Sequence, residues 1–340
     1  MNSHTPQPRS SALALWLLAM VLLVVAMIVL GGATRLTNSG LSITEWKPIS
    51  GALPPLSHEA WMSEFEKYKQ IPEFEAEHPD MTLKGFEFIY FMEWSHRQLG
   101  RFIGLAYALP FFIFLKKGYL RGRTRPYIAV LLFIGLQGVI GWWMVYSGLG
   151  NDRVDVSQYR LATHLGVAFV ILGILFWLWR EAAEAGGMKS PLLTRRSALL
   201  AVLIYWQVIA GAFVAGTHSG KTYNSWPLMD GSFIPSGYFI SRPLWRNLFE
   251  NAAAIQFNHR LLAYIITVLA IWVFISGRKH ERLSRPASIL MALIIWQGVL
   301  GIWTLLAIAP LGLSLLHQLS AVIVFLASLW LWRRSVYARG

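Results

Sequence analysis

Residues 86–115 read FEFIYFMEWSHRQLGRFIGLAYALPFFIFL, a mostly apolar run that carries a histidine, His96. The run is long enough to cross a bilayer, which takes about 20 helical residues. Seven further apolar runs lie at 12–32, 127–147, 161–180, 197–216, 252–276, 287–308 and 312–332. Such spans must be helical because lipid cannot hydrogen-bond a free backbone amide. The sequence therefore predicts an all-α membrane protein with eight transmembrane helices.

The composition favours the same class. Of the 340 residues, 55% are hydrophobic and only 14% are charged, whereas a soluble domain is typically about a quarter charged. The net charge of +13 does not indicate nucleic-acid binding, because the basic residues lie in short segments between apolar runs, as topology signals do. The chain has no cysteine, which excludes disulfides, thiolate metal sites and thiol nucleophiles.

Basic residues predict the orientation of the spans. They gather at 116–125, 180–196, 278–285 and 333–339, all on the same side as the N-terminus. The positive-inside rule makes that side cytoplasmic, so both termini are expected inside the cell. The first span is expected to be retained rather than removed as a signal peptide, because it lacks a small-residue cleavage site followed by a soluble domain.

The chain also contains an internal repeat. A shift of 180 positions aligns Gly31 with Gly211, Thr37 with Thr217, Ser39 with Ser219, Gly40 with Gly220 and Trp46 with Trp226. Further on, QGVIG at 137–141 matches QGVLG at 297–301. Each unit holds an even number of spans, so both units face the same way and the axis relating them runs along the membrane normal. We expect two pseudo-twofold-related four-helix bundles, at 1–190 and 191–340, and bundle cores commonly hold cofactors.

Each half carries two histidines within apolar spans: His96 and His164 in the first, His259 and His317 in the second. Buried imidazole is costly in a membrane and usually marks a ligand or proton site. All four are expected within about two turns of the outer face. Two histidines at matched depth can bind opposite faces of one haem iron, whereas zinc would need further ligands. Hydrogen bonding between helices is the alternative, less favoured because the positions repeat.

The halves differ three positions before the first histidine, where Glu93 stands in one half and Gln256 in the other. Glu93 shares a helix face with His96 and can exchange a proton, whereas an amide cannot. This predicts chemistry in the first half and a permanent electron-transfer haem in the second. An ion pair between Glu93 and a cation such as Arg97 is the alternative. Arg97 and Arg260 directly follow the histidines and suit haem propionates, with snorkelling as the alternative.

These motifs resemble those of haem A synthases, membrane oxidoreductases that convert haem O to haem A. The resemblance covers nearly the whole chain. It rests on GGATRLTNSGLS at 31–42, EWSHR at 93–97 and NHR at 258–260, together with His164 and His317. Each motif alone is weak, and the set is specific.

The resemblance implies that His259 and His317 ligate a bound haem b. It implies that His96 and His164 line the site of the substrate, haem O, and that Glu93 is essential to catalysis. A porphyrin methyl group is oxidised to a formyl group by successive hydroxylations, and the aldehyde forms by loss of water. Electrons pass to haem b and then to an unidentified acceptor. Association with haem O synthase and with a second copy of the chain stays open.

One departure places the chain within the family. Some members carry cysteine pairs in outer loops, and this chain has none, so it resembles the cysteine-free group of proteobacteria and mitochondria. The absence of a long Arg- and Ser-rich leader favours a bacterial inner membrane. A bis-histidine cytochrome that only carries electrons is the main rival, and it would give Glu93 no catalytic task. A parallel-repeat transporter would need polar or broken helices at mid-membrane.

Overall fold

The computed structural model describes residues 11–150, 153–183 and 191–336. Eight helices are long and apolar enough to cross a membrane. They are α1 (Ser11–Leu36), α4 (Leu83–Lys116), α5 (Thr124–Leu149), α6 (Gln158–Ala183), α7 (Pro191–Gly216), α9 (Ala252–Gly277), α10 (Glu281–Leu306) and α11 (Leu311–Val336). All eight predicted spans are confirmed, and the described part of the chain forms no β-strand. The protein is a multi-pass membrane protein.

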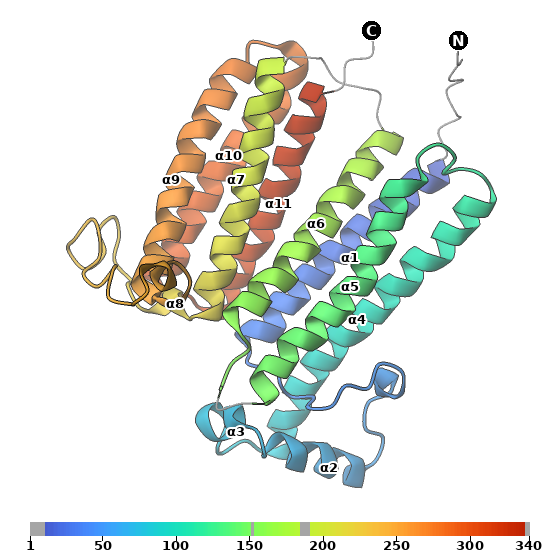
Figure 1. The fold of residues 1–340 in the computed structure, drawn as a ribbon, viewed down its shortest axis with the longest axis vertical. Helices are drawn as coiled ribbons and strands as arrows, with labels where there is room; N and C mark the ends of the chain where they lie inside the picture. Colours follow the sequence, from blue (N-terminus) through green and yellow to red (C-terminus); the bar gives the residue numbers. More distant parts are fainter. Residues whose placement is uncertain (1–10, 151–152, 184–190, 337–340) are drawn as a thin grey trace.

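The long helices pack in two groups of four (Figure 1). In the first helix group, α1 and α5 each contact both α4 and α6; in the second, α7 and α10 each contact both α9 and α11. Thus α4 lies diagonally opposite α6, and α9 lies opposite α11. The groups meet where α6 packs on α7 and α1 packs on α11. The predicted boundary at 190/191 falls at the edge of residues 184–190, which lie outside the described residues, as do Lys189 and Arg339.

One apolar core runs through both groups. Its fully buried members include Leu17, Tyr107, Leu172, Leu200 and Leu283. Large apolar side chains on the outer helix surfaces are exposed instead, as expected where lipid replaces water as the surrounding medium. Packing inside and lipid outside therefore account for the uniformly apolar helices.

The same tight turn ends α1 and α7. Asn38 (φ 48°) and His218 (φ 52°) both adopt left-handed backbone, a conformation in which Asn and His are enriched among non-glycine residues. The hydroxyls of Thr37 and Ser39 lie 2.7 Å apart, and those of Thr217 and Ser219 lie 2.5 Å apart. The sequence repeat is thus a repeat of local structure.

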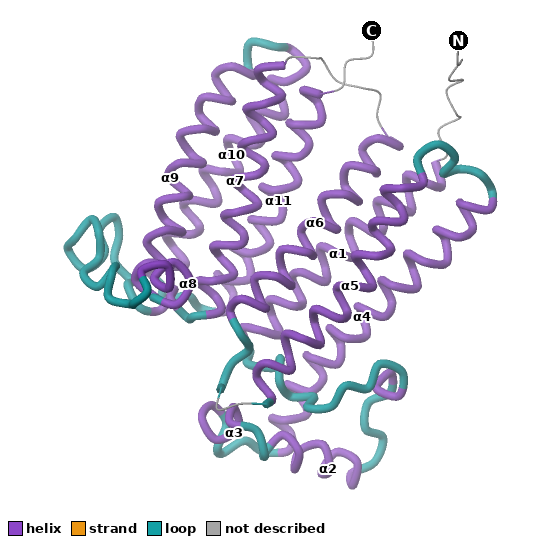
Figure 2. The backbone as a smooth tube through the Cα atoms, in the orientation of Figure 1, coloured by secondary structure: helices purple, strands orange, loops and turns teal. Residues whose placement is uncertain are grey.

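The short helices and the longest loops gather at one end of the long helices (Figure 2). The short elements are α2 (His58–Tyr68), α3 (Pro72–Glu77), α8 (Asn247–Glu250) and the 3-10 turns Ser50–Ala52, Ser219–Lys221 and Leu244–Arg246. An aromatic cluster joins α2 to α4, with the rings of Phe65 and Phe86 5.0 Å apart. Because this cluster extends α4 back to Leu83, His96 lies about three and a half turns into its helix. The other three histidines lie within about two turns of the starts of their helices, and the depth of all four below a membrane face stays a prediction.

Candidate functional site

The first histidine pair meets at the centre of the first helix group. The ring centroids of His96 on α4 and His164 on α6 lie 6.5 Å apart, edge to face. A metal bound to one nitrogen of each ring, at about 2 Å from each, fits between rings at this separation. The Nδ1 atom of His164 is buried without a hydrogen-bond partner, so a ligating nitrogen is available.

The second pair occupies the matching position in the second group. His259 lies on α9 and His317 on α11, which face each other diagonally. Among the residues that the structure describes, no three His, Asp or Glu side chains cluster as a metal site. Each pair therefore offers two imidazole donors. Such a donor set suits haem iron, for which the protein supplies only axial ligands.

Every histidine of the two pairs packs against a glycine on an adjacent helix. A Cβ at the glycine would lie 3.1 Å from the ring for Gly31 and His96, 3.1 Å for Gly141 and His164, 3.4 Å for Gly211 and His259, and 2.9 Å for Gly301 and His317. An added side chain would displace the histidine at Gly301 and crowd it by a few tenths of an ångström at Gly31 and Gly141, whereas the distance at Gly211 is an ordinary contact. The repeat contained these glycines, but their contact with the histidines was missed because sequence alone does not say which helices are neighbours.

Glu93 is buried, with 3% of its surface exposed, and both of its carboxylate oxygens are engaged. Its Oε2 atom accepts hydrogen bonds from Ser42 Oγ and Ile43 N, both at 2.8 Å. Its Oε1 atom accepts from Arg97 Nε at 3.0 Å and from Arg97 Nη2 at 2.5 Å. The ion pair considered from the sequence is therefore present. The carboxylate ties α4 to the loop that follows α1.

The two arginines anchor the outer loops at equivalent backbone positions. Arg97 donates to the carbonyls of Ile43 at 2.9 Å and Glu45 at 3.2 Å, and Arg260 donates to those of Tyr223 at 2.8 Å and Ser225 at 2.9 Å. These acceptors are related by the 180-residue shift, a signal that was available but unused. Binding of haem propionates stays a prediction for both arginines. Arg260 retains a buried Nε with no hydrogen-bond partner.

Gln256 performs the anchoring task of Glu93 without a charge. Its Nε2 donates to Ser219 O at 2.8 Å, and its Oε1 accepts from Arg260 Nη2 at 2.9 Å. The amide therefore holds both the turn after α7 and the neighbouring arginine. Anchoring of the outer loop does not by itself require a carboxylate.

Comparison with known proteins places this arrangement in a family. The profile of the cytochrome oxidase assembly proteins (COX15-CtaA) matches residues 14–329. The chain belongs to this family. It is 48% identical over 335 residues to a protein of Maricaulis maris named heme A synthase, covering 96% of this chain and 98% of that protein. It is 45% identical over 324 residues to the protein of that name from Parvibaculum lavamentivorans, covering 94% and 93%. For that of Caulobacter vibrioides the identity is 43% over 341 residues, covering 98% and 99%.

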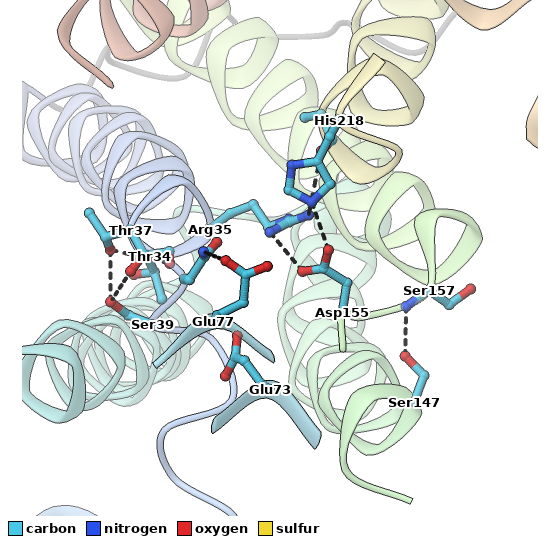
Figure 3. Close-up of polar contacts among 12 residues, drawn as sticks. Thr34, Arg35, Thr37, Ser39, Glu73, Glu77, Ser147, Asp155, Ser157 and His218 are labelled. Atoms are coloured by element: carbon cyan, nitrogen blue, oxygen red, sulfur yellow. Dashed lines mark hydrogen bonds and ion pairs between the residues drawn. The ribbon is translucent and has the colours of Figure 1, made fainter. Parts of the chain in front are cut away.

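A polar cluster joins the two helix groups at the ends where α1 and α7 finish (Figure 3). Arg35 Nη1 lies 3.0 Å from Asp155 Oδ1, and His218 Nε2 donates to Asp155 Oδ2 at 2.7 Å. Burial alone would raise the pKa of Asp155, but the hydrogen bond from His218 and the charge of Arg35 together lower it. The His218 side chain is 45% exposed, yet it pairs with a carboxylate of the other helix group.

Glu73, the second buried carboxylate after Glu93, lies beside this cluster. Glu73 on α3 is 3% exposed, and Tyr68 Oη donates to its Oε2 at 3.2 Å. Burial raises the pKa of Glu73 to about 8. The segment between α1 and α4 therefore contains a buried carboxyl group whose pKa lies well above the usual range of a glutamate.

Proposed function

We propose that this chain is a haem A synthase, a membrane oxidoreductase that oxidises a methyl group of haem O to a formyl group. Three relatives carrying that name match it at 43% to 48% identity and over nearly their whole length. The membrane fold with two histidine pairs supplies positions for a substrate haem and a resident haem. The difference between Glu93 and Gln256, set in otherwise equivalent surroundings, carries the assignment of the reactive site.

Haem O is proposed to bind between His96 and His164, and haem b between His259 and His317. When bound there, haem b would supply one-electron chemistry. The unpartnered Nδ1 of His164 supports a ligand role in the first site. In the second, the unpartnered Nε of Arg260 supports a contact with a propionate, since arginine binds carboxylates through several N–H groups. The same role is proposed for Arg97.

Glu93 is proposed to accept protons released by the reaction. With oxygen counted as water, the change is RCH3 + H2O → RCHO + 4 e− + 4 H+, so protons must leave the site. A positioned carboxylate near the reacting group typically accelerates proton transfer by about 10²- to 10⁴-fold. Arg97 pairs with the Glu93 carboxylate, and the Ser42 hydroxyl lies 2.8 Å from it. Since Gln256 anchors its loop as an amide, the ionisable group in the first half serves a purpose beyond anchoring.

The two helix groups are proposed to be four-helix bundles related by a pseudo-twofold axis along the membrane normal, within residues 1–190 and 191–340. The repeated turn and the repeated arginine anchors support this relation. We place both termini in the cytoplasm of a bacterium and the protein in its inner membrane, because Lys116, Arg333 and Arg334 lie at the end where α1 begins. Haem O synthase, an electron acceptor and a second copy of the chain stay predicted partners.

A reciprocal exchange of Glu93 and Gln256 tests the function. Cells that supply haem O would express the wild type, Glu93→Gln or Gln256→Glu, and the extracted haems would be separated by chromatography. Glu93→Gln is expected to keep haem b and to lower haem A by about 100-fold or more. Gln256→Glu controls for the altered charge and is expected to retain haem A formation. Normal haem A from Glu93→Gln would remove Glu93 from the reaction, and equal haem in both sites without conversion would favour an electron-carrying cytochrome.

A further inference from the structure

Three of the four histidine segments are held by a glutamine from a neighbouring helix. Gln137 Nε2 donates to His164 O at 2.8 Å, Gln207 Nε2 to His259 O at 3.0 Å, and Gln297 Nε2 to His317 O at 3.1 Å. Each glutamine precedes by four positions the glycine that packs on the same histidine. Residues four apart share a helix face. Glutamine and glycine therefore form one surface that fixes the backbone and the ring of the histidine.

His96 is the exception. The residue four positions before its glycine, Gly31, is Met27, and a thioether has no hydrogen to donate. Among the side chains that the structure describes, none donates to the His96 carbonyl. Met27 instead points its terminal methyl towards Gly100, where an added Cβ would lie 3.5 Å from it. Gly100 follows His96 by four positions.

The residue four positions after each histidine differs according to whether a glutamine or Met27 faces that histidine. Alanine stands four positions after each of the other three histidines, at Ala168, Ala263 and Ala321. The fourth position has Gly100, which leaves room for the long thioether. Met27 and Gly100 therefore replace a glutamine and an alanine as a matched pair.

The glutamines of the two helix groups also differ in how close they lie to the histidine rings. The amide nitrogen of Gln207 lies 3.2 Å from both ring nitrogens of His259. That of Gln297 lies 3.2 Å and 3.5 Å from the ring nitrogens of His317. Gln137 makes only the backbone bond to His164. In the second group the amide nitrogen therefore bonds the backbone of each histidine and also lies beside its ring, in the first group it bonds the backbone of His164 alone, and His96 has neither contact.

We propose that Met27, together with Gly100, is a positioning residue that keeps the His96 site exchangeable, whereas the glutamines keep the haem of the second group resident. This inference rests on the proposed function, in which the first site must release each product haem. Groups held in their binding geometry before the ligand arrives bind more tightly, and the gain appears mainly as slower dissociation. A helix turn that lacks this restraint releases its ligand faster.

The experiment measures haem loss from the full-length protein loaded with haem O. Transfer of each haem to excess apomyoglobin would be followed by chromatography, because haem O and haem b differ in mass. Met27→Gln combined with Gly100→Ala is expected to slow loss of haem O about threefold to tenfold, the range for an interhelical hydrogen bond in a membrane. Met27→Leu, which adds no donor, is expected to leave the rate unchanged. Gln207→Met is expected to speed loss of haem b alone.

Each result decides the inference. An unchanged haem O rate in the double variant, or an unchanged haem b rate in Gln207→Met, overturns it. If either variant changes the rates at which both haems are lost, the fold has loosened generally, and the inference is also overturned. A wild-type protein that takes up no haem O at all refutes the proposed function, and the inference with it. This outcome is distinguishable because haem b content is measured in the same sample.

Discussion

Replacing Gly301 by alanine tests whether the resident haem depends on the close approach of helix and histidine. The new Cβ would lie 2.9 Å from His317 Cε1 and 3.6 Å from Nδ1. Because carbon atoms in favourable contact are about 3.5–4.0 Å apart, the imidazole must move by several tenths of an ångström. Overpacking of this kind costs about 1–3 kcal/mol. If that cost falls on the ligand position, the affinity for haem b decreases about fivefold to about a hundredfold.

The assay is the rate at which haem b leaves the purified protein for apomyoglobin. Gly298→Ala is the matched control on the same helix, because nothing lies within 4 Å of the added Cβ. Gly211→Ala is a second comparison, since its Cβ would sit at an ordinary 3.4 Å from His259. We expect rapid loss from Gly301→Ala and nearly wild-type rates from both others. Equal rates for Gly301→Ala and Gly298→Ala would refute the reasoning.

Two further predictions concern the outer loop and the ligands. Burial raises the pKa of Glu73 from 4.5 to about 8, so the folded protein holds a proton that the unfolded chain has released. The contribution of this proton to the free energy of unfolding is fully present below about pH 4.5 and is lost as the pH rises through about 8. Its size is about 1.4 kcal/mol for each unit by which the folded and unfolded pKa values differ. Glu73→Gln is expected to flatten this decline in thermal unfolding midpoints, and a parallel decline in both proteins would contradict it. His259→Ala and His317→Ala are each expected to reduce haem b content strongly, because either change removes an axial ligand, while His96→Ala leaves haem b in place. An unaltered low-spin haem spectrum in both second-group variants would disprove the assignment of the halves.

The membrane spans could be predicted because the bilayer imposes a single requirement on the chain. Each crossing needs about 20 apolar residues in a helix, so length and hydropathy sufficed to find all eight. The repeat was equally readable because matched turns demand matched residues, as at Thr37 and Thr217. The helix α4 begins at Leu83, slightly before the predicted apolar run, where the Thr82 side chain caps it.

The sequence was enough to predict which residues form the candidate site, but not which atoms they bond to. Glu93, His96 and Arg97 stand out because charge and imidazole are rare in apolar runs. Glu93 and Arg97 both bond to backbone atoms of Ile43, about 50 positions away, and no side-chain pattern marks a backbone group as a partner. The pairing of His218 with Asp155 likewise depends on how two separate helix groups meet. Contacts of this kind follow from tertiary packing alone.

Conversion of haem O by the intact protein tests the central claim most directly. The wild type would be expressed in cells that supply haem O, and the extracted haems would be separated by chromatography. Our account predicts haem A together with retained haem b. Haem O recovered unchanged, beside a stably bound pair of haems in the purified protein, would contradict it.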